Sequence, residues 1–109
     1  MSLADRYSRQ ILFREIGKKG QTLIQQSHVL IVGCGALGSI QAEILARAGV
    51  GELTLIDRDL LEASNLQRQM LYDENQLALH LPKAIAAKER IAHINSEVTV
   101  HAAVTDIRP

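Results

Sequence analysis

The stretch HVLIVGCGALGS, at residues 28–39, constrains the fold of this chain more than any other segment. Its apolar run at 29–32 is typical of a strand buried on both faces, and the glycines that follow indicate a tight turn. Apolar residues then recur at helical spacing, at Leu37, Ile40, Ile44 and Ala48. This spacing predicts an amphipathic helix over residues 36–48, and a second apolar run at 53–56 predicts another strand. Together these segments predict a βαβ unit with parallel strands.

Weaker signals surround this unit. Asp73 and Gln76 have capping-box spacing, which predicts a short helix, and Pro82 suits the first turn of the next one. Residues 98–104 alternate in the manner of a strand with one better-covered face, which we expect at an edge of the sheet. Ahead of residue 28, apolar residues predict two short helices that are broken around two glycines, Gly17 and Gly20.

Composition excludes several classes of function. The 109 residues carry 12 Lys and Arg against 12 Asp and Glu, and this balance argues against a surface for nucleic acid or an anionic membrane. No apolar run approaches the roughly 18 residues of a membrane span, and the N-terminus lacks the pattern of a secretory signal. The single cysteine, Cys34, cannot form an internal disulfide or a multi-cysteine zinc site. We therefore expect one small cytoplasmic domain.

The glycines of the turn predict a nucleotide site. Gly33, Gly35 and Gly38 fit G-x-G-x-x-G directly after a strand and at the start of a helix, and Asp57 closes the next strand. Gly33 would permit the tight turn, Gly35 the approach of a phosphate or ribose, and Gly38 close packing of the helix. The helix N-terminus would favour phosphate, and Asp57 would accept from ribose hydroxyls. A dehydrogenase-like site for NAD(P) remains an alternative.

The segment DRDLLEASNLQRQ, at residues 57–69, favours a nucleoside triphosphate over a dinucleotide. Asn65 and Arg68 lie three residues apart and can project together, and a guanidinium makes bidentate contacts with phosphate. Lys83, at the start of the following helix, can add a point charge. Ordinary surface charges on a solvated loop would produce the same spacing, so this alternative stays open.

In their order and spacing, four segments resemble the N-terminal half of the ThiF/MoeB/HesA family, relatives of the ubiquitin-activating enzymes. The segments are RYSRQILFREIGKKGQ, VLIVGCGALGS, AGVGELTLIDRD and SNLQRQ, the last being the most specific. The resemblance implies an ATP-dependent adenylyltransferase. Such an enzyme activates the C-terminal carboxylate of a ubiquitin-like sulfur-carrier protein for thiamine or molybdenum-cofactor biosynthesis.

The resemblance also implies roles for individual residues. It places the adenosine ribose on Asp57 and on the glycine turn, formed by Gly33, Gly35, Ala36 and Gly38. It places the triphosphate among Asn65, Arg68 and Lys83. Arg9 matches an arginine that reaches the triphosphate of the neighbouring subunit in the family's dimers, which implies a homodimer. Asp59 is a candidate for a second ribose contact or a carboxylate near the metal, and a loop-capping role is equally compatible with its position.

The implied fold is α/β: the N-terminal half of a Rossmann-like doubly wound parallel sheet, with strand order 3-2-1 and N-terminal helices. Residues 1–27 are expected to form the helical segment and residues 28–109 the first half of the ATP-binding domain. Family members continue to an aspartate that binds Mg²⁺ and often to paired zinc-binding cysteines. We therefore expect the chain to be part of a longer protein, inactive alone, with no metal ligand of its own.

Two other functions remain open at this point. An NAD(P)-binding module of the dehydrogenase type would need only the glycine turn and Asp57. A non-catalytic docking protein would keep the fold and lose the cations of the triphosphate site, which are present here. Cys34 is expected to pack as a small apolar group, and the histidines lie apart without metal-ligand spacing, at His28, His80, His93 and His101.

Overall fold

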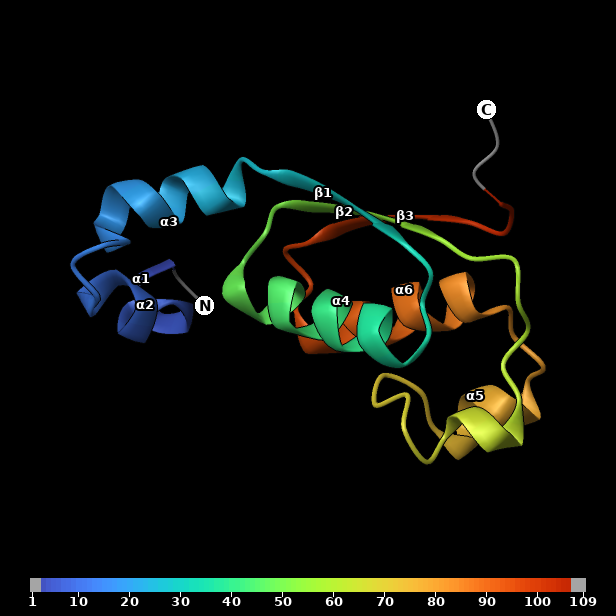
Figure 1. The fold of residues 1–109 in the computed structure, drawn as a ribbon. Helices are drawn as coiled ribbons and strands as arrows, with labels where there is room; N and C mark the ends of the chain where they lie inside the picture. Colours follow the sequence, from blue (N-terminus) through green and yellow to red (C-terminus); the bar gives the residue numbers. More distant parts are fainter. Residues whose placement is uncertain (1–2, 107–109) are drawn as a thin grey trace.

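The computed structural model describes residues 3–106, and Figure 1 shows a layer of strands with helices on one side and a helical extension at one end. The extension contains α1 (Leu3–Arg6), α2 (Ser8–Leu12) and α3 (Gly17–Gln25). The strands are β1 (His28–Val32), β2 (Glu52–Ile56) and β3 (Thr99–Ala103). The remaining elements are α4 (Ala36–Ala48), the 3-10 turn η1 (Ala63–Asn65), α5 (Glu74–Ala78) and α6 (Lys83–Ile94).

The three strands form a parallel sheet in the order β1-β2-β3. This arrangement confirms the predicted βαβ unit, the strand order 3-2-1 and the edge position of the third strand. His28, Glu52 and Thr99 are in register at the amino ends of the strands. Because parallel strands end at the same edge, the glycine turn after β1 and Asp57 after β2 lie side by side.

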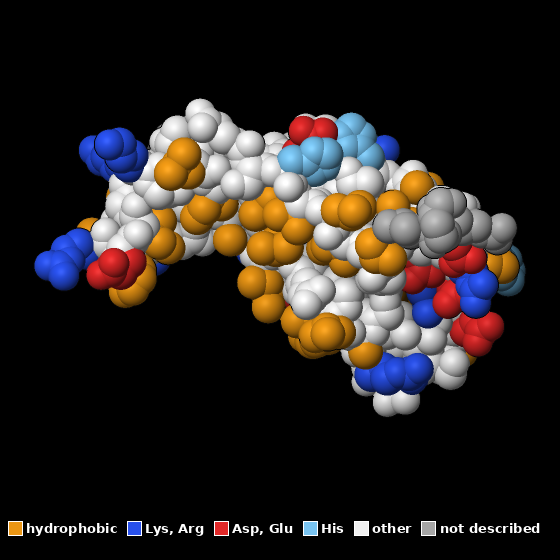
Figure 2. Space-filling model, turned by 45° about the horizontal axis from the view of Figure 1, so that its top comes forward, with side chains coloured by type: hydrophobic (Ala, Val, Ile, Leu, Met, Phe, Trp, Pro, Cys, Tyr) orange, Lys and Arg blue, Asp and Glu red, His pale blue; other side chains and the backbone are white. Residues whose placement is uncertain are grey.

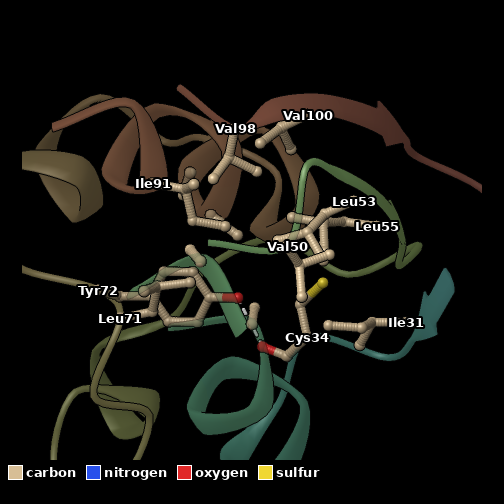
Figure 3. Close-up of a cluster of buried hydrophobic side chains, with 14 of the residues drawn as sticks. Ile31, Cys34, Val50, Leu53, Leu55, Leu71, Tyr72, Ile91, Val98 and Val100 are labelled. Carbon is tan, nitrogen blue, oxygen red and sulfur yellow. Dashed lines mark hydrogen bonds between the residues drawn. The ribbon is translucent and has the colours of Figure 1, made fainter. Parts of the chain in front are cut away.

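The core lies between the sheet and two helices, α4 and α6 (Figure 1). Figure 3 shows Leu53 and Leu55 of β2 in this cluster with Ile91 of α6, and each of these side chains is fully buried. The helix predicted to follow Pro82 is confirmed as α6, and Ala84 and Ala87 on it are also fully buried. The capping box predicted for α5 is confirmed by both of its hydrogen bonds.

The apolar stripe predicted for α4 points away from this core. Leu37 and Ile44 are 69% and 58% exposed, and the helix buries its small residues instead, at Ser39, Ala42 and Ala46. Ala42 and Ala46 belong to the core cluster that also holds Ile91 of α6, so α6 packs against the small-residue face of α4. The prediction that β1 is buried on both faces is also wrong, since Leu30 and Val32 are exposed and the described helices cover one face of the sheet. Figure 2 shows hydrophobic side chains gathered on the surface of the molecule.

The N-terminal extension differs from the prediction of two helices broken around two glycines. Three helices are present in the described part; Gly17 begins α3 and Gly20 lies inside it. Tyr7 anchors the extension to the sheet domain, because its buried hydroxyl accepts a 2.9 Å hydrogen bond from Asn95 after α6. None of the helices in residues 3–106 combines the length and apolar character needed to cross a membrane.

Candidate functional site

The three glycines of the turn meet different physical demands. Gly33 has a φ of +94°, a left-handed conformation that favours glycine, and its N–H donates to the Ile56 carbonyl at 2.7 Å. A Cβ atom on Gly38 would lie 1.8 Å from the Gly33 carbonyl oxygen. A Cβ on Gly35 would have only Gln69 Nε2 within 4 Å, at 4.0 Å, among the described atoms. Gly33 and Gly38 thus serve the fold, whereas Gly35 leaves open space beside the turn.

Asp57 is fixed by the backbone around it. One carboxylate oxygen, Oδ2, accepts from the Cys34 N–H and the other, Oδ1, from the Asp59 N–H, both at 2.7 Å. Each carboxylate oxygen has a second lone pair, so a ribose hydroxyl can still bind. Gly33, Asp57 and Asp59 line a recess of about 170 Å³. The predicted ribose residue therefore sits at a hollow beside the glycine turn.

Cys34 is held by hydrogen bonds on both sides of its backbone, and its thiol is buried. Its carbonyl accepts a 2.5 Å hydrogen bond from the Tyr72 hydroxyl, drawn in Figure 3, while its N–H binds Asp57. Burial raises the pKa of the Cys34 thiol to about 12; the negative charge of Asp57 adds to the rise, and the Lys83 ammonium opposes it. The side chain is 1% exposed and belongs to the core, as predicted.

A second, highly polar recess of about 330 Å³ brings together the three residues predicted for the triphosphate, Asn65, Arg68 and Lys83. Asn65 closes η1 and is buried; its Oδ1 accepts from the Glu62 N–H at 2.8 Å, which orients its amide. Arg68 is exposed, and its Nη1 donates to the Ser64 carbonyl at 3.0 Å. The predicted grouping of these three side chains is thus present in the structure.

Lys83 is unusual because it is a buried cation without an ion pair. It begins α6, its backbone N–H donates to the Asp59 carbonyl at 2.9 Å, and the residue is 7% exposed. No carboxylate of the described residues lies within 4.0 Å of its ammonium nitrogen. Because this side chain lines the polar recess without a carboxylate partner, its position favours an anionic ligand there.

Arg9 lies far from these residues in the same chain. It is an exposed residue of α2, in the extension at the amino end of the sheet, whereas the glycine turn follows the carboxyl end of β1 (Figure 1). Ala36 is the first residue of α4, where the backbone N–H groups have no acceptor in the preceding turn. Ala36 thus lies directly after the glycine turn, at the start of α4, and Arg9 lines neither recess.

The described residues supply no metal centre. No group of three or more His, Cys, Asp or Glu side chains within residues 3–106 could hold a metal ion. The four histidines are exposed and spread over separate elements, as predicted. Asp59 forms a 3.8 Å ion pair with Arg58 and lines both recesses. Because Mg²⁺ usually takes one or two carboxylates together with phosphate oxygens and waters, these residues do not by themselves define a magnesium site.

Sequence reasoning missed two residues of this region, Gln69 and Tyr72. Both belong to the loop that follows η1, and both are buried against the glycine turn. Neither takes part in an apolar period or a capping pattern, so no spacing rule singles them out. Gln69 is the last residue of the SNLQRQ segment, and its place in that segment was the available signal, whereas Tyr72 lies outside every segment singled out from the sequence.

Known proteins resemble this chain in sequence and in structure. The ThiF family matches residues 7–109. The Bacillus subtilis sulfur carrier protein ThiS adenylyltransferase is 49% identical over 105 residues, which are 96% of this chain and 31% of that protein. The Salmonella typhimurium molybdopterin-synthase adenylyltransferase is 42% identical over 95 residues, 87% of this chain and 37% of that protein.

A solved structure agrees with these matches. The crystal structure of the Escherichia coli tRNA N6-threonylcarbamoyladenosine dehydratase TcdA in complex with ATP has a TM-score of 0.85 and 35% identity; the match covers 95% of this chain and 41% of that one. The present chain thus spans about a third of the length of the curated relatives compared here. The resemblance inferred from the motifs is confirmed, and the chain belongs to the ThiF family.

Proposed function

We propose that the protein is an ATP-dependent adenylyltransferase that activates the C-terminal carboxylate of a ubiquitin-like sulfur-carrier protein. The observation that carries the proposal is the buried Lys83, which has no ion pair in the described chain and lines a polar recess with Asn65 and Arg68. Two relatives are named adenylyltransferases for sulfur-carrier or molybdopterin-synthase proteins, and TcdA was crystallised with ATP.

The proposed reaction needs cations more than acids or bases. A carboxylate oxygen of the carrier attacks the α-phosphorus, the bond to the bridging oxygen breaks, and pyrophosphate leaves with the electron pair. Negative charge grows on the departing oxygens, so Arg68 and Lys83 stabilise the transition state more than the bound ATP. The Asn65 amide adds a neutral donor, and Asp57 holds the ribose so that the phosphorus is aligned.

Residues 28–109 are the proposed first half of the ATP-binding domain, with the glycine turn, Ala36 and Asp59 around the nucleotide. Residues 1–27 form the proposed helical segment that places Arg9 at the triphosphate of a second subunit in a homodimer. The distance of α2 from the recess in its own chain favours this division of labour. The alternative, NAD(P) binding, gives no role to the unpaired Lys83.

Pyrophosphate exchange into ATP in the presence of the carrier tests the proposal directly. Arg68→Ala and Lys83→Ala in the full-length protein should each lower the exchange rate by about a hundredfold, which corresponds to about 3 kcal/mol of transition-state stabilisation. Lys88→Ala, which removes an exposed lysine from the same helix, is the matched control and should leave the rate unchanged. Exchange near the wild-type rate in both site variants, or tighter binding of NADH than of ATP, would refute the proposal.

The role of Arg9 needs a separate experiment. Arg9→Ala and Arg68→Ala proteins should each be inactive, and mixing them under conditions of subunit exchange should restore activity through heterodimers with one intact site. Light scattering of the mixture, or a pull-down through a tag on one of the two variants, must show that subunits have exchanged. Equal inactivity after demonstrated exchange would mean that Arg9 does not act across a subunit interface.

A further inference from the structure

Gln69 is a buried glutamine that the proposed reaction leaves without a role. The residue is 3% exposed, and its Oε1 atom has no hydrogen-bond partner among the described residues. The other two buried glutamines of the described chain, Gln21 and Gln76, each donate through Nε2 to a backbone carbonyl and accept through Oε1. An unsatisfied buried amide destabilises a fold, so its presence at Gln69 needs an explanation other than stability.

The amide of Gln69 faces the open space at Gly35. Its Nε2 atom is 4.0 Å from the position that a Cβ of Gly35 would occupy, and apart from Gly35 and its two chain neighbours no other described residue has an atom within 4 Å of that position. Gly35 is also the N-cap residue of the 13-residue helix α4, and no side chain caps this helix. The backbone N–H groups of the first turn and the Gln69 amide therefore border the same gap.

The neighbours of this gap indicate which part of a nucleotide reaches it. On one side, the Asp57 carboxylate binds the N–H of Cys34, the residue before Gly35, and Asp57 is the proposed ribose contact. On the other side, Lys83 lies near enough to Cys34 to lower the pKa of its thiol against the larger effect of burial. The group that joins the ribose to the outer phosphates is the α-phosphate. A nucleotide with its ribose at Asp57 and its outer phosphates at Lys83 would therefore place the α-phosphate next to Gly35.

We infer that the side-chain amide of Gln69 donates through Nε2 to the α-phosphate of the bound nucleotide and so positions the phosphorus for attack. The inference rests on the proposed function and adds a recognition element for nucleoside 5′-phosphates to it. The terminal torsion of glutamine is soft, so the amide can turn toward an entering phosphate. This rotation also moves the Gln69 Oε1 atom out of the position in which it has no hydrogen-bond partner. A neutral donor holds the phosphate oxygen without adding charge beside Lys83.

Binding of three nucleotides to the full-length protein separates this contact from the rest of the site. Gln69→Glu keeps the shape of the side chain and replaces its donor by a charged acceptor. Calorimetry should show ATP and AMP, which both carry an α-phosphate, bound on the order of tenfold more weakly. Adenosine, which lacks the phosphate, should bind within about twofold of the wild-type affinity. Gln67→Glu makes the same charge change at an exposed position of the same loop and should affect none of them.

Each outcome has a distinct meaning. Unchanged binding of ATP and AMP, or an equal loss for adenosine, would overturn the role of Gln69 and leave the proposed function intact. A wild-type protein that binds no ATP would instead overturn the proposed function. If urea unfolding shows that Gln69→Glu is not folded, Gln69→Leu provides the same comparison. This variant removes the unsatisfied polar group. If it binds ATP and AMP more weakly but adenosine as well as the wild type does, the contact between Gln69 and the α-phosphate is supported.

Discussion

Two glycines of the same turn give opposite predictions for replacement by alanine. A Cβ on Gly38 would lie 1.8 Å from the Gly33 carbonyl oxygen and 2.9 Å from its carbonyl carbon, and both are backbone atoms that cannot swing aside. A Cβ on Gly35 would have a single neighbour within 4 Å among the described atoms, the Gln69 amide at 4.0 Å. The φ of Gly35 is −82°, outside the left-handed region, and its ψ of −147° lies just beyond the usual β range, so alanine meets only mild backbone strain there. Only Gly38→Ala must therefore push α4 away from the turn.

The size of each effect follows from these distances. Real Cβ contacts are essentially never shorter than 3.0 Å, so Gly38→Ala must open the gap of 1.8 Å by at least 1.2 Å. Overpacking costs typically about 1–3 kcal/mol, and the rigid neighbour places this case at about 3 kcal/mol. At about 4–8 °C per kcal/mol, the melting temperature should fall by roughly 12–24 °C. Gly35→Ala replaces an uncapped N-cap glycine and should cost about 0.5 kcal/mol.

Urea unfolding followed by circular dichroism measures the stability of both variants, and calorimetry measures the affinity of Gly35→Ala for ATP. Gly38→Ala should lose stability. Gly35→Ala should keep its stability and lose affinity for ATP, because the added methyl group fills the space proposed for the α-phosphate. A Gly38→Ala protein within about 1 kcal/mol of the wild type would refute the packing argument. Equal destabilisation of the two variants would show that Gly35 is not open.

Three further predictions concern the core and the exposed apolar surface. Tyr72→Phe leaves the buried Cys34 carbonyl without its donor and should lower the free energy of unfolding by about 1–2 kcal/mol; an unchanged urea midpoint would contradict this. Because burial raises the pKa of the Cys34 thiol from 9.0 to about 12, the unfolded thiol loses its proton first. Between pH 9 and about pH 10, before the buried Tyr7 and Tyr72 contribute in the same direction, the free energy of unfolding should therefore fall by up to about 1.4 kcal/mol per pH unit, and urea titrations should find this fall much reduced in Cys34→Ala. Residues 1–109 alone should self-associate in sedimentation through the exposed Leu30 and Val32, and replacing both by lysine should give a monomer.

The sequence predicted the elements of the fold better than their orientation. The bounds of α4 and the strands around it are set by local signals, namely apolar runs and glycine stops, so they could be located without a structure. The buried face of α4 could not, because the packing of α6 against Ala42 and Ala46, which leaves Leu37 outside, comes from a segment distant in the sequence. Close backbone contacts between segments leave no periodic trace in the sequence.

The candidate site shows the same division. Asn65, Arg68 and Lys83 carry charge or amide groups at a recognisable spacing, and they line one recess as expected. The burial and ion pairing of a side chain depend on distant segments. The residues near Lys83 in the sequence do not indicate that its ammonium group has no ion pair with a carboxylate of the described residues. The unsatisfied Oε1 of Gln69 is likewise visible only when the loop after η1 is folded against the glycine turn.

One peptide unit links the two halves of the site. The N–H of Cys34 binds Asp57, the residue proposed to hold the ribose, and its carbonyl accepts from Tyr72, on the loop that also supplies Arg68 and Gln69. A movement of that loop would therefore pull on the turn and change the position of the Asp57 carboxylate relative to the phosphate residues. The proposed adenylyl transfer would depend on alignment at the α-phosphorus, which the proposed site holds between the two groups. The short hydrogen bonds on both sides of Cys34 would thus fix the geometry that the proposed reaction needs before ATP binds.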